Sequence, residues 1–553
     1  MVVLCLKKSR GMIITIMTKR VSFFLTKMLY FTLAILFLIA FGLSIYAFFN
    51  PDMHFFQLDM QYRAVAFLLL VLFLLGLLFI IKRAERNPDT DRINYVDLIM
   101  LFFIAFCARL VFLLFYGYFV APVSDFQMAH ITAQGWAPPE FFELYRMYTN
   151  WAVYTVILGI LYDLTISHFI MAQFLNVIFS SLTAVVIYAI SLKISHKRSI
   201  AYTAAVFFAL YPANILSNAL LFMDHIAVFL ICTIIYFMLR MRQADNLNQS
   251  SPVKYYIICV ITGIILGVEN SLKTMSTVLI IAFLISLTID FFINKDDVKA
   301  ASLISKPIFK IISTAVILVS FMTVSNYAVE RVAQEVHGIE FTDSRNITAS
   351  MIYIGLQPSG EGQIHLGDNP RLFQTMLEKA DGDFDLARQM TYDFLWQDIR
   401  ENPGQFALLF PQKFRWAWQD DTVPSYFVWI TPAGDWVSIF QNPDPISPRL
   451  EYIARVILPS ISQIFYIALV GFSVIGFLGA VKQRFCFGKF LMSLYSFGFI
   501  LLLLIIEAQS RYKIMIIPCL CILAAYGIYI TFNRVSRIRI PWKKYLMKSA
   551  EGK

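Results

Sequence analysis

Charged residues are scarce in this sequence. Only 15% of the 553 residues are charged, and 59% are hydrophobic. An average soluble domain is about 25% charged and about 45–50% apolar, so the deficit excludes an ordinary soluble globular protein. The mean hydropathy is +0.67, and the apolar residues fall in repeated runs of about 17–25, the length that crosses roughly 30 Å of hydrocarbon. The composition therefore predicts an integral membrane protein.

Cysteine and histidine are also sparse. None of the seven cysteines falls in the large segment 329–452, and the sequence contains no CxxC pair. His337 and His365 in that segment are too isolated to indicate a metal site. We therefore expect neither a disulfide framework nor a protein-built metal site. The sequence leaves a divalent cation as a cofactor open.

The net charge of +10 could suggest a nucleic-acid partner, but its distribution argues against one. Of the 46 Lys and Arg residues, 30 lie in short segments beside alternate apolar runs, and in the N- and C-terminal segments. This alternation follows the positive-inside rule. We therefore expect a multi-pass protein of the plasma membrane with both termini in the cytoplasm, the lipid bilayer as a partner, and no nucleic acid.

Twelve membrane spans are expected. They are residues 28–50, 64–81, 97–118, 169–192, 199–216, 219–239, 255–271, 275–294, 308–328, 454–481, 490–506 and 514–532. The stretch 151–168 is apolar but interrupted by Asp163, and we interpret it as a re-entrant or interfacial helix. The predicted fold class is an all-α polytopic membrane protein of about 12 transmembrane helices with one mixed extracytoplasmic domain.

The spans divide the chain into four parts. The predicted parts are 1–93, with the cytoplasmic N-terminus and two transmembrane helices; 94–328, a transmembrane core with an outer loop at 119–168; 329–452, an extracytoplasmic domain; and 453–553, the last helices and a basic cytoplasmic tail. The third part holds 18 of the 36 acidic residues. Its length suffices for a small domain.

Ionisable residues beside the spans gather on the predicted outer face. Because a charge at a bilayer is costly unless it is paired or faces a cavity, such residues are functional candidates. Asp125 follows the third span and is either a general base toward a hydroxyl or a solvated loop acid. Asp224 and His225 begin the sixth span, where an acid either positions a ligand or complements the helix dipole.

Three further groups join these candidates. Glu269 and Lys273 are four residues apart, so Lys273 either binds a phosphate or pairs with Glu269 on one helix face. Glu507, Arg511 and Tyr512 lie between the last two spans, where Arg511 is a phosphate ligand or, with Tyr512, an interfacial anchor. Arg109, deep in the third span, needs a carboxylate or phosphate partner, and a structural pairing is favoured.

A series of marks runs in a fixed order from residue 94 to residue 530. These marks are Arg109, Asp125, Tyr211-Pro212, Asp224, the glycines of 263–267 with Lys273, Asn402-Pro403 with Lys413 and Trp416, and Glu507 with Arg511-Tyr512 and Pro518. Their order and spacing resemble the GT-C glycosyltransferases of family 39. The bacterial relatives of protein O-mannosyltransferases and of the aminoarabinose transferase of lipid A are the most similar. Two spans precede the usual first one, and Phe126 stands where protein mannosyltransferases carry a second acid.

The resemblance implies a membrane enzyme that moves a sugar from a polyprenyl-phosphate donor to an extracytoplasmic acceptor. That acceptor is a cell-envelope glycan, a teichoic acid, a lipid or a protein. It implies inversion, with Asp125 as the catalytic base and with Lys273, Arg511 and Tyr512 at the donor phosphate. Two alternatives stay open. One is a flippase or transporter, although we find no internal repeat. The other is a polysaccharide polymerase or ligase with a lipid-diphosphate donor.

Overall fold

The computed structural model describes most of the chain. The described residues are 2–50, 60–85, 93–116, 120, 122, 124–246, 252–293, 302–358, 372–422, 424 and 457–537. All regular elements within these ranges are helices, with no strand among them. The expected all-α class is therefore confirmed.

Eleven helices of the described chain are long and apolar enough to cross a membrane. They are α1 (Val2–Phe49), α2 (Met60–Glu85), α3 (Tyr95–Phe115), α7 (Phe169–Ser195), α10 (Asp224–Asn246), α11 (Pro252–Lys273), α12 (Ser276–Ile293), α13 (Ser302–His337), α20 (Leu458–Val481), α21 (Phe487–Ile505) and α22 (Ile517–Arg537). A twelfth crossing forms if α8 (Arg198–Ala209) and the segment 212–219, bent by 50°, count as one span. That segment comprises α9 (Pro212–Leu216) and the 3-10 turn η3 (Ser217–Ala219). Each of the twelve expected spans thus has a helix or a bent helix pair.

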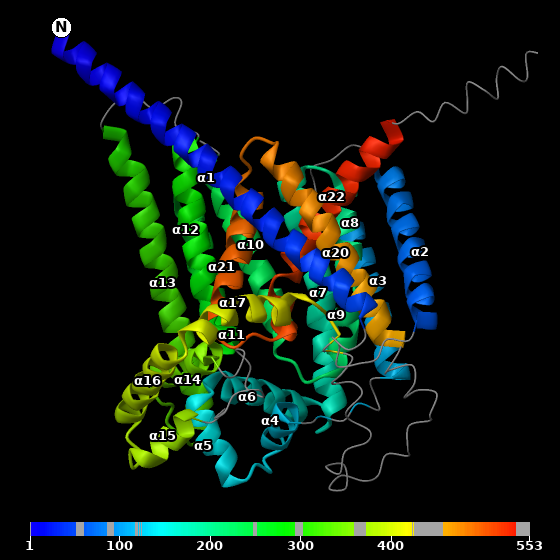
Figure 1. The fold of residues 1–553 in the computed structure, drawn as a ribbon, viewed down its shortest axis with the longest axis vertical. Helices are drawn as coiled ribbons and strands as arrows, with labels where there is room; N and C mark the ends of the chain where they lie inside the picture. The colour runs from blue at the N-terminus through cyan, green and yellow to red at the C-terminus, as the bar shows by residue number, and fades with distance from the viewer. Residues whose placement is uncertain are drawn as a thin grey trace, which may run out of the picture.

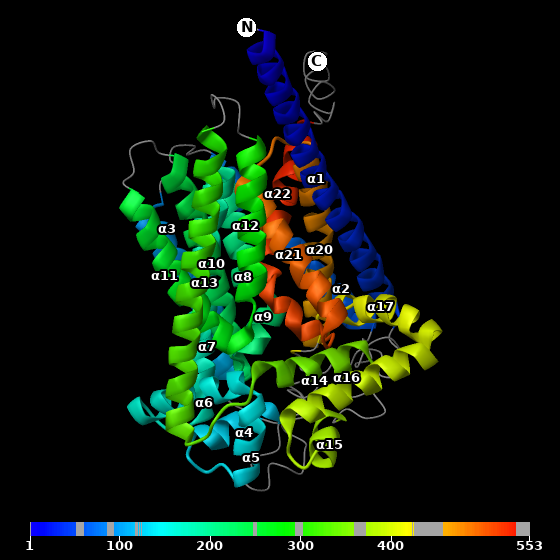
Figure 2. The same cartoon turned by 90° about the vertical axis from the view of Figure 1, so that its left-hand side faces the viewer.

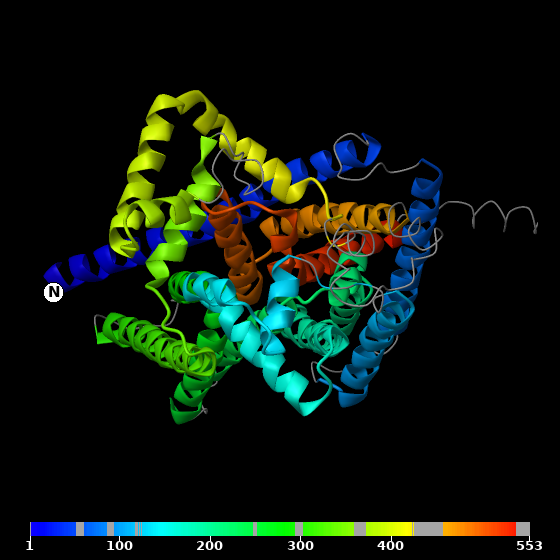
Figure 3. The same cartoon turned by 90° about the horizontal axis from the view of Figure 1, so that it is seen from below.

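The remaining long helices gather at one end of the bundle, which we call the cap (Figures 1 and 2). The cap consists of α4 (Asp125–Ala133), α5 (Pro139–Met147), α6 (Thr149–Leu164), α14 (Ser344–Leu356), α15 (Leu372–Lys379), α16 (Phe384–Glu401) and α17 (Pro403–Trp418). Seen from below, α4–α6 lie beside α14–α17 across the end of the bundle (Figure 3). The stretch expected to be interfacial is mostly α6, a helix of 16 residues that packs on α4 and α13.

The expected extracytoplasmic domain is helical wherever it is described. Helix α13 runs past the predicted boundary at residue 328 to His337, whose Nε2 lies 2.9 Å from Thr155 Oγ1 on α6. Helices α14–α16 share a small core of their own around Tyr353 and Phe373. The mixed character that we expected is not found among these residues. His365 lies outside the described residues.

Glycines set the distance between two neighbouring helices. A Cβ at Gly267 on α11 would lie 2.5 Å from the backbone oxygen of Met322 on α13, and one at Gly263 would lie 2.7 Å from Phe321 Cβ. Within a bilayer the hydrophobic effect does not drive helices together, so helices associate by close packing. Small residues permit that close approach. The glycine-rich pattern of this span therefore fixes α11 against α13, and with it the position of Lys273 at the end of α11.

The end of the bundle opposite the cap carries the basic segments between helices, and we call it the basic end. There Asp97 on α3 accepts hydrogen bonds from Arg198 Nε at 2.8 Å and from Tyr188 Oη at 2.9 Å. Arg242 and Asp290 form an ion pair at 2.5 Å between α10 and α12. Buried charges must be paired. The contacts of Asp97 therefore join α3 to α7 and α8, and the pair of Arg242 with Asp290 joins α10 to α12.

Candidate active site

The site begins with the segment that leads into α10. Side-chain amides of α7 hold this segment, because Gln173 donates to the carbonyl of Ala219 at 2.7 Å and Asn176 donates to that of Leu220 at 2.6 Å. Asp224 then opens α10 and is buried. A carboxylate at a helix N-terminus complements the helix dipole. The fold thus places a buried acid at the cap end of the bundle.

Lys273 is the partner of this acid. Its Nζ lies 3.0 Å from Asp224 Oδ1 and 5.8 Å from the centre of the Tyr512 ring. Lys273 is the last residue of α11, so three segments far apart in the sequence meet here. The pair is the first direct evidence that the candidate residues of the outer face converge.

Glu269 does not pair with Lys273, so the alternative based on their spacing is wrong. Its carboxylate accepts from the backbone nitrogen of Met275 at 3.3 Å and from Ser276 Oγ at 2.6 Å. The backbone nitrogen of Met275 precedes α12 and has no partner within that helix, and Ser276 Oγ also lies 2.6 Å from the carbonyl of Leu266 on α11. Glu269 thereby fixes the turn between α11 and α12, and Lys273 is left to reach α10.

The turn η8 (Ser510–Met515) supplies the other side of the cluster. Glu507 Oε2 accepts from Tyr512 Oη at 2.8 Å, and the Arg511 guanidinium lies 5.3 Å from the centre of the Tyr512 ring. Burial alone would lower the pKa of Arg511, but Tyr512, Glu507 and Asp224 outweigh it and raise the pKa. The arginine is therefore a fixed positive charge within the electrostatic reach of Asp224.

Asp125 lies near the segment that leads into α10, and no described contact joins it to Lys273 or Arg511. It is the first residue of α4 and is partly exposed, after Ser124 with φ of +53°, a value that is rare outside glycine. The next residue, Phe126, packs its ring 5.0 Å from that of Phe222, two residues before Asp224. Burial raises the pKa of Tyr145 to about 12, Thr132 opposes that shift, and the charge of Asp125 adds to it.

Arg109 and His225 take other places. Arg109 is fully buried and donates to Ser180 Oγ at 2.7 Å and to the carbonyl of Ala209 at 2.7 Å. Arg109 therefore has hydrogen-bond acceptors without a carboxylate or phosphate. Backbone carbonyls at the end of α8, next to the bend in that span, accept its hydrogen bonds. His225 is buried, and its Nε2 has no hydrogen-bond partner in the described chain. No contact joins it to the Lys273 pair.

A comparison with protein families relates part of this chain to a known family. Residues 154–336 match the model of the family described as dolichyl-phosphate-mannose-protein mannosyltransferase. The predicted resemblance is confirmed. The match runs from α6 to α13 and contains Asp224, Glu269 and Lys273, whereas Asp125 and Arg511 lie outside it. No curated protein matches the chain. At the level of the family, the match supports a membrane glycosyltransferase with a polyprenyl-phosphate sugar as donor.

A second buried pair beside the Asp224–Lys273 cluster was not predicted. Lys513 Nζ lies 3.4 Å from Asp421 Oδ1, and Tyr211 donates to the other oxygen of Asp421. Burial raises the pKa of Asp421, and Lys513 and Tyr211 oppose the shift. Tyr211 was one of the family marks, and the acidic doublet before residue 422 was the only sequence signal for its partner. The pair joins the segment after α17 to η8 and to the bend before α9.

Lys413 on α17 fixes the segment that carries Glu507. Its Nζ donates to the carbonyls of Gly355, Leu504 and Ile506 at 2.6, 2.9 and 2.7 Å. Burial lowers the pKa of Lys413 to about 7, and Glu507 opposes that shift. Three carbonyl acceptors favour the protonated amine, so its role is to join α14 to the end of α21. Among the described residues, no group of three His, Cys, Asp or Glu is placed to hold a metal ion.

Proposed function

We propose that this chain transfers a sugar from a polyprenyl-phosphate donor to a hydroxyl of an extracytoplasmic acceptor, with inversion at the anomeric carbon. One observation carries the proposal. Asp224, Lys273, Arg511 and the Glu507–Tyr512 pair come from three separate segments, α10, α11 and residues 507–512, and form one cluster at the cap end. The family match at 154–336 supports the donor class.

The donor phosphate is assigned to Lys273 and Arg511, with Tyr512 between them. When the sugar leaves, negative charge localises on the phosphate, and preorganised cations stabilise that charge. Asp224 holds Lys273 at 3.0 Å, which keeps the lysine in place before the donor arrives. Arg511 is positioned by the ring of Tyr512. A phosphate leaving group with two cations needs no general acid.

Asp125 is assigned as the base. The acceptor oxygen attacks the anomeric carbon, and its proton passes to the Asp125 carboxylate. The bond between that carbon and the phosphate oxygen breaks, and its electron pair stays on the phosphate. The partial exposure of Asp125 and the positive φ of Ser124 support this role, because strained backbone clusters at functional sites. In this reading the cap faces the exterior.

The remaining candidates support Asp125, Lys273 and Arg511 without contacting the reacting groups themselves. Glu269 fixes the end of α11, Glu507 orients Tyr512, and Arg109 holds the bend that precedes the segment leading to Asp224. His225 follows Asp224 on α10. We assign Glu269, Glu507 and Arg109 as positioning residues, because their described contacts are to other groups of the protein.

The test is Asp125→Asn in purified protein reconstituted in lipid nanodiscs. Radiolabelled undecaprenyl phosphates carrying mannose, glucose or aminoarabinose are offered with a cell-envelope fraction as acceptor. General-base catalysis is worth about 10²–10⁴-fold, so the rate should fall by that factor while donor affinity stays within about two-fold. The matched control is Asp393→Asn, an exposed acid on α16, which should transfer at the wild-type rate.

Three outcomes would overturn the proposal. Near-normal turnover of Asp125→Asn would remove Asp125 from the base role. Transfer only from a lipid diphosphate carrying an oligosaccharide would favour a polymerase or ligase. Movement of labelled lipid across proteoliposomes, with no label appearing on a glycan or protein, would favour a flippase.

A further inference from the structure

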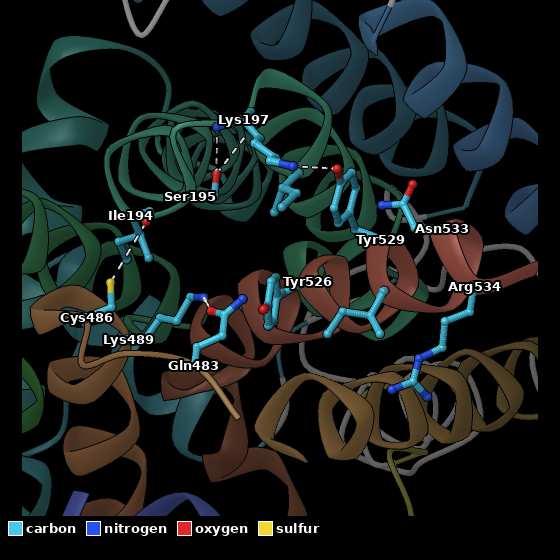
Figure 4. A pocket seen from close by; sticks show the side chains of 12 residues that line it. Ile194, Ser195, Lys197, Gln483, Cys486, Lys489, Tyr526, Tyr529, Asn533 and Arg534 are labelled. Carbon is cyan, nitrogen blue, oxygen red and sulfur yellow. Dashed lines mark hydrogen bonds between the residues drawn. The ribbon is translucent and has the colours of Figure 1, made fainter. Parts of the chain in front are cut away.

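A pocket opens at the basic end, far from the cap. Its cavity volume is about 440 Å³, and it lies where α7 ends, α8 and α21 begin, and α22 passes (Figure 4). The residues that line it are Ile194, Ser195, Lys197, Ile200, Gln483, Cys486, Lys489, Tyr526, Tyr529, Ile530, Asn533 and Arg534. Three of them are cations, and no described lining residue is acidic. The proposed sugar transfer makes no use of this pocket.

The two lysines are held in place by neutral groups. Lys489 is nine-tenths buried, and its Nζ donates to Gln483 Oε1 at 2.7 Å and lies 3.8 Å from the centre of the Tyr526 ring. Lys197 Nζ donates to Tyr529 Oη at 2.5 Å and lies 4.4 Å from the centre of that ring. Neither contact neutralises the charge. Among the described residues, no acid pairs with Lys197 or Lys489, whereas the neighbouring Arg198 pairs with Asp97.

The backbone adds to the positive potential. Both α8 and α21 begin beside the pocket, and neither Lys197 nor Cys486 at their N-caps supplies a side-chain cap. The first N–H groups of a helix have no partner within it and favour an anion. Arg534, on the exposed rim, adds a third cation. The pocket therefore suits a group with several anionic oxygens, such as a phosphate.

We propose that this pocket binds the phosphate of an anionic phospholipid head group. Lys197, Lys489 and Arg534 hold the phosphate, and Ile194, Ile200 and Ile530 in the same lining meet the first part of the acyl chains. The pocket lies where the spanning helices end, the depth at which lipid head groups sit. Basic pockets between membrane helices bind anionic head groups in this way. The proposal is independent of the sugar transfer assigned to the cap end.

The experiment measures lipid retention by native mass spectrometry of the full chain in a neutral detergent. Phosphatidylglycerol and phosphatidylcholine are titrated separately, and inorganic phosphate is added as a free-anion competitor. We expect phosphatidylglycerol to be retained and phosphatidylcholine to be lost. Each of Lys489→Gln and Lys197→Gln should weaken retention about five-fold. Arg534→Gln, a change at an exposed residue that does not threaten folding, should also weaken it.

The matched control is Lys254→Gln. Lys254 is an exposed lysine of α11 that does not line the pocket, and its replacement should leave retention unchanged. An equal loss with Lys254→Gln would show a diffuse surface effect and overturn the site. So would equal retention of the two lipids. If inorganic phosphate binds and phosphatidylglycerol binds no more tightly, the pocket is a free-anion site and the lipid assignment fails.

Discussion

The two ends of the helical bundle use charge in opposite ways. At the cap end, acids and cations from distant segments lie together: Asp224 with Lys273, Arg511 within their reach, and Glu507 with Tyr512. In the pocket at the basic end, Lys197 and Lys489 meet only neutral partners. The cations of the cap-end cluster therefore lie beside acids, whereas the two lysines of the pocket lie beside neutral groups.

The difference matches two kinds of chemistry. A reaction that releases phosphate and removes a proton needs both signs of charge within one site. Holding a head group needs only cations. The ion pairs at the basic end, such as Asp97 with Arg198, lie outside the pocket lining and join helices. We therefore expect substitutions at the cap end to change the reaction and substitutions of the basic-end ion pairs to change stability.

Asp97→Asn tests the structural half of this comparison and has the largest expected effect. Removing one partner of a buried ion pair leaves the other charge uncompensated, at a cost of about 3–5 kcal/mol. Thermal unfolding in detergent should show a clear loss of stability, while the transfer rate per folded molecule stays the same. A reduced rate at unchanged stability would contradict the division between the two ends.

Lys273→Gln tests the chemical half. Loss of one preorganised donor to a developing oxyanion costs about 10²–10³-fold in rate, so transfer should fall by that factor, with weaker donor binding. Rates and donor affinity would be measured with the same labelled undecaprenyl phosphates. Lys254→Gln, an exposed lysine at the other end of α11, is the control. The phosphate assignment fails if Lys273→Gln binds donor normally.

Gly267→Ala asks whether the position of Lys273 depends on helix packing. The added Cβ would lie 2.5 Å from a backbone oxygen of α13, and overpacking of this kind costs about 1–3 kcal/mol. Both stability and transfer should fall, because α11 carries Lys273. Gly42→Ala on α1, where nothing lies within 4 Å, should change neither. Equal behaviour of the two variants would refute the packing argument.

His130 on α4 should make the stability of the cap sensitive to acid. Burial, with a smaller effect of His168, lowers its pKa from 6.5 to about 4. The unfolded chain therefore binds more protons than the folded chain between these values, so stability rises with pH from about 4 to 6.5. At pH 5 the loss is about 2 kcal/mol.

The measurement is the unfolding midpoint at pH 7.5 and pH 5 for wild type and His130→Phe. The substitution should reduce the shift between the two pH values by the His130 contribution, and His168, whose pKa burial also lowers, should retain its own. It also removes the contact of His130 Nδ1 with Tyr162 Oη, so the comparison is made within each variant. An unchanged shift would assign the acid sensitivity to another group.

Most of the fold was predictable because the hydrocarbon core of a bilayer offers the backbone no hydrogen-bond partners. Each expected span, from 28–50 to 514–532, has a helix or the bent pair, since an apolar run in a bilayer must satisfy its backbone by forming a helix. The extent of α13 to His337 was not predicted, because its last turns lie over α6 and not in an apolar run. In the cap, the helix expected within 151–168 is present as α6, whereas the mixed domain expected at 329–452 is helical wherever it is described.

Within the site, spacing gave the right end of the bundle but the wrong partners. Glu269 and Lys273 are neighbours on one helix face, yet Glu269 finds its partner across the turn to α12 and Lys273 finds its partner on α10. Arg109 is satisfied by carbonyls that a bent span exposes. Asp421 was passed over because nothing in an acidic segment shows which acid becomes buried against Lys513.

The sequence by itself determined the class of this protein, its spans and the end at which its ionisable residues gather, because hydropathy and charge act locally along the chain. Only the tertiary structure decided which acid meets which cation and where a pocket opens without acids. Those choices depend on contacts between segments far apart in the sequence, such as Asp97 with Arg198 and Lys197 with Tyr529. Burial enforces them, since a charge removed from water must find a partner at whatever point the packing of helices provides one.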